Sequence, residues 1–190
     1  MRKKGRIRML LGGILIVIAG LLLSHNLIED HLAGSSAKKI VTSLKASTGT
    51  KVAKPSLKKT AKVDGTAYSG YLYFPSLGLS LPVAAKWRFS QLEVSPATYY
   101  GKPETRDWVV AGHNFTTQFG KLIDLNIGDT VNFVGTSGYT FVYRVAAMEI
   151  IKPTAIKKMV DNKYDLSLFT CNYDGTARYT VRCSLVTAKR

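Results

Sequence analysis

Apolar and polar residues follow three different patterns along the chain. Residues 9–23 are uncharged and mostly apolar, residues 33–62 are mostly Lys, Ser, Thr, Ala and Gly, and short apolar runs then alternate with polar residues. Alternation with a period of two residues is typical of half-buried strands. It predicts strands at residues 71–74, 79–83, 108–111, 130–134, 139–151, 165–171 and 178–186. Brief helices are expected at residues 90–94, 121–126 and 154–160.

The strand-rich part of the chain has the size of one domain. Residues 66–190 are long enough to enclose a modest core. The expected strands are closely spaced and separated by short loops with Gly or Pro, such as residues 75–78 and 135–138. We therefore expect a mostly β fold, a single closed β-barrel of about seven to eight strands with short helices. A β-sandwich is the alternative.

The N-terminal region indicates export or membrane attachment. Five basic residues within residues 1–8 precede the apolar run, which extends to residue 28 if weakly polar positions are included. A membrane-spanning helix needs about 20 residues. We expect a cytoplasmic basic segment at residues 1–8 and an uncleaved transmembrane anchor at residues 9–28, with the remainder on the extracellular, cell-wall side. The alternative is a signal peptide cleaved among the small residues at 33–37.

Residues 29–65 are expected to form a flexible basic linker, because large apolar residues are few there and cannot offset the entropy of ordering. Residues 1–64 carry 13 Lys and Arg against 3 acidic residues, a net of +10, which leaves +5 of the total charge of +15 for the rest. Attraction to anionic lipid or wall polymer explains a charge concentrated in this region. No nucleic-acid partner is expected.

Candidate chemistry is confined to a few side chains. His25 and His31 adjoin the apolar N-terminal run, which leaves His113 as the one histidine of the expected domain. The chain has two cysteines, and Cys171 ends a strand-like run directly before a turn, whereas Cys183 falls within the last strand. One thiol and one imidazole that meet in space are typical of a cysteine acyl-transfer enzyme.

The last two expected strands indicate a partner for Cys171. If residues 165–171 and 178–186 form a hairpin, Cys171 and Arg178 face each other at its mouth. Arg182 is the alternative, but it lies about 13 Å farther along the strand at roughly 3.3 Å per residue. Cys183 falls on the apolar side of this strand, about 16 Å from the mouth, whereas a disulfide requires Cα atoms within about 7 Å. We therefore expect the two cysteines to remain unpaired.

These motifs resemble those of the sortases, the membrane-anchored cysteine transpeptidases of Gram-positive bacteria. Sortases have a strand that ends in TLxTC, a His followed by Asn after a buried strand, and an Arg on the strand after the Cys. The corresponding residues here are Ser167 to Cys171 (SLFTC), His113 with Asn114, and Arg178. Ser167 replaces the usual Thr and retains a hydroxyl that can form a hydrogen bond. The resemblance extends from about residue 68 to residue 186.

The resemblance also implies an activity. Cys171 would attack the Thr carbonyl of a sorting signal similar to Leu-Pro-x-Thr-Gly, His113 would be the general acid and base, and Arg178 would stabilise the oxyanion. The expected partners are secreted proteins that carry such a signal and an amine acceptor, either a cell-wall precursor or a lysine of another protein. No metal or organic cofactor is expected. Supporting or substrate-binding roles are expected for Asn114, Leu168 and Thr170.

Two other functions remain compatible with these residues. One is another cell-envelope cysteine peptidase or an L,D-transpeptidase, although the latter usually has a Ser-x-Gly-Cys-x-Arg context and here Thr170 precedes Cys171. The other is a noncatalytic exported β domain that binds the wall or a partner protein.

Overall fold

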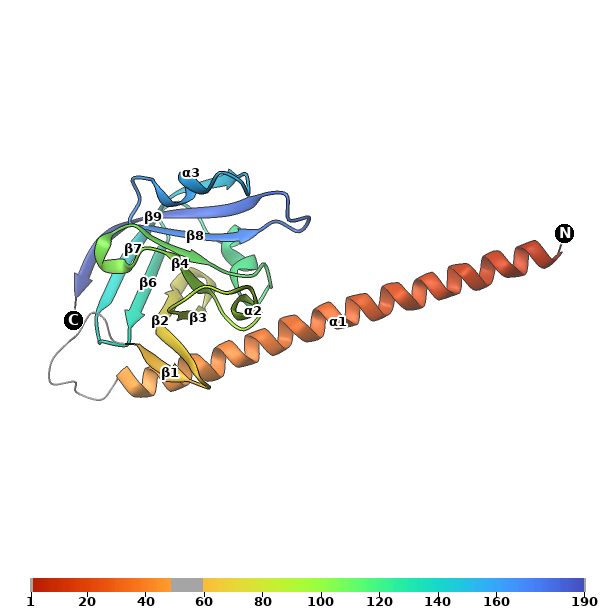
Figure 1. Ribbon diagram of the computed structural model, residues 1–190, viewed down its shortest axis with the longest axis horizontal. Coiled ribbons are helices and arrows are strands. Elements are labelled where there is room, and N and C mark those ends of the chain that lie inside the picture. The colour runs from red at the N-terminus through yellow and green to blue at the C-terminus, as the bar shows by residue number, and fades with distance from the viewer. Residues whose placement is uncertain (1, 49–59, 190) are drawn as a thin grey trace.

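The computed structural model describes residues 2–48 and 60–189, in which a long helix leads into a β-barrel (Figure 1). The α-helices are α1 (Arg2–Thr48), α2 (Phe89–Leu92) and α3 (Ile156–Val160), and the 3₁₀ helices are η1 (Pro75–Leu77), η2 (Pro103–Thr105) and η3 (Phe119–Asp124). The strands are β1 (Ala61–Val63), β2 (Thr66–Phe74), β3 (Leu79–Ala84), β4 (Ala97–Tyr100), β5 (Trp108–Ala111), β6 (Thr130–Gly135), β7 (Thr140–Ile151), β8 (Leu166–Cys171) and β9 (Arg178–Lys189).

The sheet closes on itself. The strand order is β1-β2-β3-β4-β5-β8-β9-β7-β6, and an additional pairing of β2 with β6 joins the ends of an eight-stranded ring, with β1 attached outside it. The β3–β4 and β5–β8 pairs are parallel and the others are antiparallel. The expectation of a closed mostly β barrel is confirmed, and the sandwich alternative is wrong. Closure leaves few exposed strand edges in the ring.

The strands follow the alternation of the sequence wherever one face is buried. Along β6, buried and half-buried residues alternate over its whole length, and the buried ones face the barrel interior. Trp108 packs against Phe133 there, with ring centroids 4.5 Å apart. Two short strands were not expected from the sequence, β1 and β4. With three and four residues they are too short for a period to be recognised.

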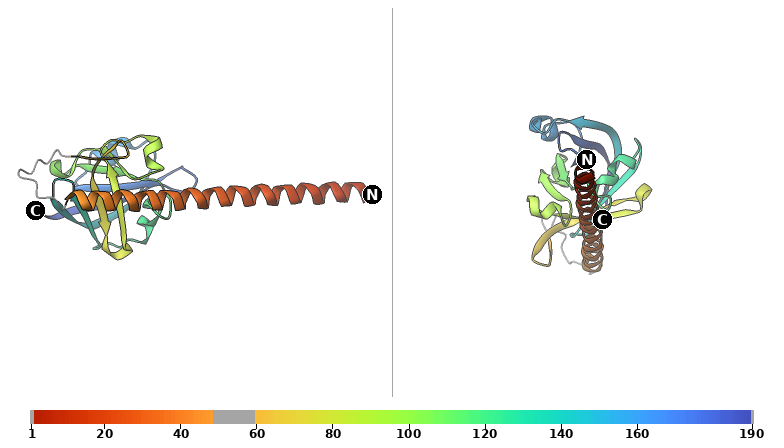
Figure 2. Two further views of the ribbon diagram at one scale, coloured as in Figure 1. Left: turned by 90° about the horizontal axis from the view of Figure 1, so that it is seen from below. Right: turned by 90° about the vertical axis from the view of Figure 1, so that its right-hand side faces the viewer.

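The second half of α1 corrects the expectation of a linker over residues 29–65. Residues 29–48 continue the helix and pack against the barrel, and β1 lies within the same stretch, while residues 49–59 lie outside the described residues. The residues that α1 buries share one helix face: Ala33, Ala37, Ile40, Val41 and Leu44. Large apolar residues are few in residues 33–62 as a whole, so composition alone suggested a segment without a core. The left view of Figure 2 shows this half of the helix running along the barrel, where it contacts β1, β2 and β3.

The first half of α1 projects away from the barrel (Figure 1). Its large apolar side chains from Ile7 to Ile28 are exposed. Within the described residues, α1 is the helix long and apolar enough to cross a membrane, a property that an anchor and a signal sequence share. The helix runs from this exposed half into the docked half without a break.

Candidate active site

The parallel pairing of β5 with β8 brings the ends of two strands together. Ala111 pairs with Phe169, and the Gly112 amide donates a hydrogen bond to the Phe169 carbonyl over 3.0 Å. The alignment therefore continues past the end of β5, and His113 follows at the level of Cys171. Cys171 is the last residue of β8, and His113 lies two residues after the end of β5. Both therefore lie where a buried strand ends, and the Cys171 side chain is exposed there.

The hairpin between β8 and β9 positions Arg178. Cys171 and Arg178 are register partners, as the hairpin interpretation expected. The connecting loop is tight: the Ala177 amide donates to the Asn172 side chain over 2.8 Å, and Gly175 adopts a φ of 73° that favours glycine. Nη1 of Arg178 donates to the carbonyls of Gly175 and Ala177, each over 3.2 Å. The guanidinium is thus held at the mouth of the hairpin, near the exposed Cys171.

His113 lies in a compact loop after β5. Its ring stacks on Phe115 with centroids 3.9 Å apart, and its carbonyl accepts a hydrogen bond from the Phe119 amide over 3.2 Å. Nδ1 of His113 is buried and has no hydrogen-bond partner within residues 2–48 and 60–189. Gly112 permits this packing, because a Cβ there would lie 2.4 Å from the Phe119 ring. The imidazole is held by stacking, which leaves its Nδ1 unpaired among these residues.

Two grooves meet at Cys171. The first, called here the apolar groove, has a volume of about 230 Å³ and is lined by Trp87, Phe89, Leu92, Tyr99, Ala111, Gly112, Lys152, Pro153, Ala155, Ile156, Met159, Phe169, Cys171 and Arg178. Aromatic rings form one of its walls: Tyr99 contacts both Trp87 and Phe169 edge-on, with centroids 5.8 and 5.4 Å apart. A concave apolar surface that is also lined by one thiol and by the cations of Lys152 and Arg178 suits an extended peptide with small apolar side chains. The sequence had given no reason to assign these rings to a groove.

The second groove, called here the hairpin groove, has a volume of about 260 Å³ and is lined by Asn114, Phe119, Gly120, Ile123, Ile150, Thr170, Cys171, Asn172, Tyr173, Ala177 and Tyr179. Burial raises the pKa of Tyr179 above its ordinary value. Asn114 and Thr170 thus lie beside Cys171, where supporting roles were expected for them. Leu168 does not, because it points into the barrel core and lines neither groove.

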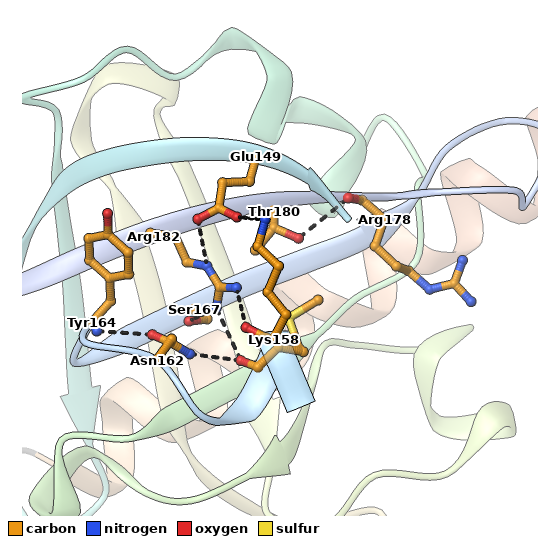
Figure 3. A network of polar contacts seen from close by, with 9 residues as sticks. Glu149, Lys158, Asn162, Tyr164, Ser167, Arg178, Thr180 and Arg182 are labelled. Carbon is orange, nitrogen blue, oxygen red and sulfur yellow. Dashed lines mark hydrogen bonds and ion pairs between the residues drawn. The ribbon is translucent and has the colours of Figure 1, made fainter. Parts of the chain in front are cut away.

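Arg182 belongs to a different site (Figure 3). Its side chain is 1% exposed and donates to the Ser167 hydroxyl over 2.6 Å and to the carbonyls of Met159 and Lys158 over 3.1 and 2.8 Å. Glu149 lies 3.6 Å from its Nε. These contacts fasten α3 to β8 and β9, and Figure 3 shows the Arg178 side chain extending away from them. The alternative of Arg182 as the partner of Cys171 is therefore not supported.

The same network sets the ionisation of Glu149. A hydrogen bond from Lys158, whose Nζ is 2.8 Å away, and the charge of Arg182 lower the pKa of Glu149 below its ordinary value. The Ser167 hydroxyl, where sortases usually have Thr, is used here as an acceptor for Arg182. Ser167 therefore holds the arginine in place from the outer face of β8.

Cys183 is a core residue. It is fully buried inside the barrel, and burial raises the pKa of its thiol. Its register partner on β8 is Leu166, at the opposite end of that strand from Cys171, and both cysteines are free. A buried thiol with a raised pKa is a poor nucleophile at neutral pH.

Comparisons with known proteins agree with this geometry. The sequence profile of the sortase domain matches residues 72–186. No curated protein sequence matches the chain. Similar solved structures include sortase C-3 from Streptococcus pneumoniae (20% identity, TM-score 0.59, covering 83% of this chain and 85% of that chain). Sortase D5, a transpeptidase from Clostridium perfringens, has 18% identity and a TM-score of 0.64, covering 80% and 99%. Sortase A from Corynebacterium diphtheriae has 18% identity and a TM-score of 0.56, covering 89% and 95%.

Proposed function

Because the chain belongs to the sortase family of cysteine transpeptidases, we propose that it cleaves a sorting signal similar to Leu-Pro-x-Thr-Gly after Thr and transfers the new C-terminus to an amine. The observation that supports this most directly is the meeting of Cys171, Arg178 and both grooves at the mouth of one hairpin. The family membership favours this reaction over that of an L,D-transpeptidase and over a noncatalytic binding domain.

The first half of the reaction forms a thioester. The Cys171 thiolate attacks the Thr carbonyl carbon, and the carbonyl electrons move to oxygen. Arg178 donates hydrogen bonds to this oxyanion, a role suited to a cationic fork held in place by its own hairpin. When the oxyanion collapses, the bond from the Thr carbonyl to the following nitrogen breaks. His113, as imidazolium, gives its proton to the departing amine.

The second half restores the enzyme. The acceptor amine attacks the thioester carbonyl and loses a proton to His113, which is neutral after the first half. Collapse of the second oxyanion expels the Cys171 thiolate and leaves a new amide bond. The thiol and the imidazole thus return to their starting protonation states, and no redox step or additional co-reactant is needed.

We assign the substrate peptide to the apolar groove and supporting roles to Asn114 and Thr170. Aromatic and aliphatic walls match the Leu and Pro of such a signal, and Cys171 is one of the residues that line this groove. Its partners on this proposal are secreted proteins that bear the signal and an acceptor amine of a cell-wall precursor or another protein. The apolar half of α1 would remain as an anchor, with the N-terminus inside and the barrel on the wall side.

The test uses the full chain in detergent micelles. Wild type, Cys171→Ala, His113→Ala and Arg178→Ala are incubated with a panel of sorting-signal peptides and a small amine, and mass spectrometry follows cleavage, thioester and amide product. Cys183→Ala is the matched control, because it removes the thiol that the barrel buries. We expect product from wild type and the control, and none from Cys171→Ala.

A different pattern would overturn the proposal. If no peptide reacts while Cys171 is still alkylated rapidly, the thiol serves another substrate. If Cys171→Ala retains transfer, the proposed nucleophile is wrong.

A further inference from the structure

The docked half of α1 begins almost at the end of its apolar half. Asp30 lies two residues after Ile28, the last of the large exposed apolar side chains before the polar turn. At a rise of about 1.5 Å per residue, this separation is roughly 3 Å along the helix axis. From there the helix runs along the barrel (Figure 2, left). Lys39 in this part of the helix pairs with Asp64 over 3.3 Å.

Asp30 binds the loop that carries His113. Its carboxylate accepts hydrogen bonds from the Thr117 amide over 3.0 Å and from the Thr116 amide over 3.3 Å, and from both threonine hydroxyls. The Thr117 hydroxyl also lies 2.8 Å from the Asp30 carbonyl. A carboxylate that accepts from two adjacent amides and two hydroxyls is a strong and directional clamp. The clamp joins Asp30 to Thr116 and Thr117, which lie 86 and 87 positions later in the sequence.

The clamped threonines are rigidly connected to His113. On one side His113 stacks on Phe115, and on the other its carbonyl accepts from the Phe119 amide. Within the loop, the amides of Gln118 and Gly120 donate to the Phe115 carbonyl over 2.9 and 3.0 Å. Because these hydrogen bonds close the loop around Thr116 and Thr117, a displacement of the two threonines would also displace His113.

A close approach of the α1 backbone to the Thr117 side chain supports the same contact. Gly34 lies one turn after Asp30 on α1, and a Cβ there would be 2.8 Å from the Thr117 methyl carbon. Glycine is therefore required for the helix to reach the loop, although it costs helix stability relative to alanine. Asp30 and Gly34 together form the surface of α1 that meets the His113 loop.

We propose that Asp30 is a positioning residue that acts through Thr116 and Thr117 to hold the His113 loop, so that the segment of α1 directly after the apolar half is part of the working enzyme. The inference rests on the proposed function insofar as His113 is taken as the acid and base. It assigns a role in the site to a segment whose composition is that of a tether.

The test compares variants of the full chain in detergent micelles. Asp30→Asn keeps one side-chain acceptor oxygen, Asp30→Ala keeps only the backbone carbonyl, and Gly34→Ala is designed to push the helix away from Thr117. Glu29→Gln is the matched control, because Glu29 pairs with His25 on the exposed side of the helix. Each variant is measured for kcat and KM of peptide transfer, for the pH profile of Cys171 alkylation by iodoacetamide, and for its melting temperature.

We expect kcat to fall roughly tenfold in Asp30→Ala and Gly34→Ala, and less in Asp30→Asn, because small displacements of catalytic groups reduce rates strongly. KM for the peptide should stay within about twofold, since neither groove is lined by Asp30. The alkylation profile should shift towards that of His113→Ala. Glu29→Gln should match wild type in all three measurements.

The inference is overturned if Asp30→Ala and Gly34→Ala keep the wild-type kcat and alkylation profile. It is also overturned if their losses merely follow the fraction of unfolded protein, which the melting curves give. Alkylation needs no peptide substrate. A wild type that transfers no peptide would therefore refute the proposed function, while the alkylation profiles would still decide the role of Asp30.

Discussion

Arg178 and Arg182 lie on one face of β9, but replacing them should affect different properties: catalytic activity for Arg178 and stability for Arg182. Arg182 is buried and donates three hydrogen bonds within the α3 network. The Arg178 side chain lies at the hairpin mouth and, within residues 2–48 and 60–189, donates to carbonyls of its own loop. We predict that Arg182→Met lowers the free energy of unfolding strongly, and that Arg178→Met abolishes transfer while leaving stability nearly unchanged.

The magnitude follows from the contacts that each substitution removes. Arg182→Met leaves the Ser167 hydroxyl and the carbonyls of Lys158 and Met159 without their donor, and Glu149 without one of its two cations. Breaking a buried charged network of this kind costs about 3–5 kcal/mol. That is a large fraction of a total stability of roughly 5–15 kcal/mol. Arg178→Met removes exposed contacts, for which the expected change is within about 0.5 kcal/mol.

Urea unfolding followed by tryptophan fluorescence measures the difference, since Trp108 is buried in the barrel core. With a slope of about 1–3 kcal/mol per molar urea, the midpoint for Arg182→Met should fall by roughly 2 M relative to wild type. The Arg178→Met midpoint should coincide with that of wild type. A loss of less than about 1 kcal/mol in Arg182→Met would refute the reasoning, because it would mean that water or a neighbouring side chain satisfies the network.

Three further outcomes can be measured on the same protein. Iodoacetamide should label Cys171 alone in the folded chain and both thiols after unfolding, because Cys183 is fully buried and its pKa is raised. Mass spectrometry of the intact protein counts the labels. Rapid double labelling without unfolding would contradict this prediction. The pKa of Glu149 is lowered by Lys158, so its contribution to stability should be complete above its unfolded pKa of about 4.3 and be lost as the pH falls through the lower folded value. Glu149→Gln should therefore flatten the acid side of the plot of melting temperature against pH, and an unchanged slope would rule out this contribution. Gly112→Ala should reduce transfer at least tenfold, because the new Cβ would lie 2.4 Å from the Phe119 ring and displace the adjacent His113. Wild-type kinetics in this variant would show that the Phe119 ring moves aside.

The sequence predicts the part of the site that depends on local alternation. Cys171 and Arg178 could be placed opposite each other because a period of two and a short turn determine the register of a hairpin. The length and spacing of apolar runs likewise indicated a closed mostly β fold, since closure follows from many short strands with one buried face. These predictions need only neighbours in sequence.

The remaining features depend on contacts between distant segments. Nothing near Asp30 indicates that its acceptors lie at Thr116 and Thr117, because that contact exists only once α1 has docked. The alternation of β9 places Arg182 on the same face as Arg178, and only the packing of α3 over this face buries Arg182 away from the site. Leu168 belongs to the SLFTC motif, and this suggested a role in the site. Its side chain instead faces the core, because its neighbours Ser167 and Phe169 face outward.

The unbroken course of α1 has a consequence for the geometry of substrate encounter. A flexible linker of about 30 residues would let the barrel sample heights above a membrane over roughly 30 Å. A docked helix that continues straight from its apolar half allows one height and one orientation instead. With that half in a bilayer, the active site would lie at a fixed distance from the membrane. A sorting signal would then react only if its scissile bond is presented at the same distance from the lipid. The spacing between a substrate's own membrane segment and its signal would then matter as much as the signal's sequence.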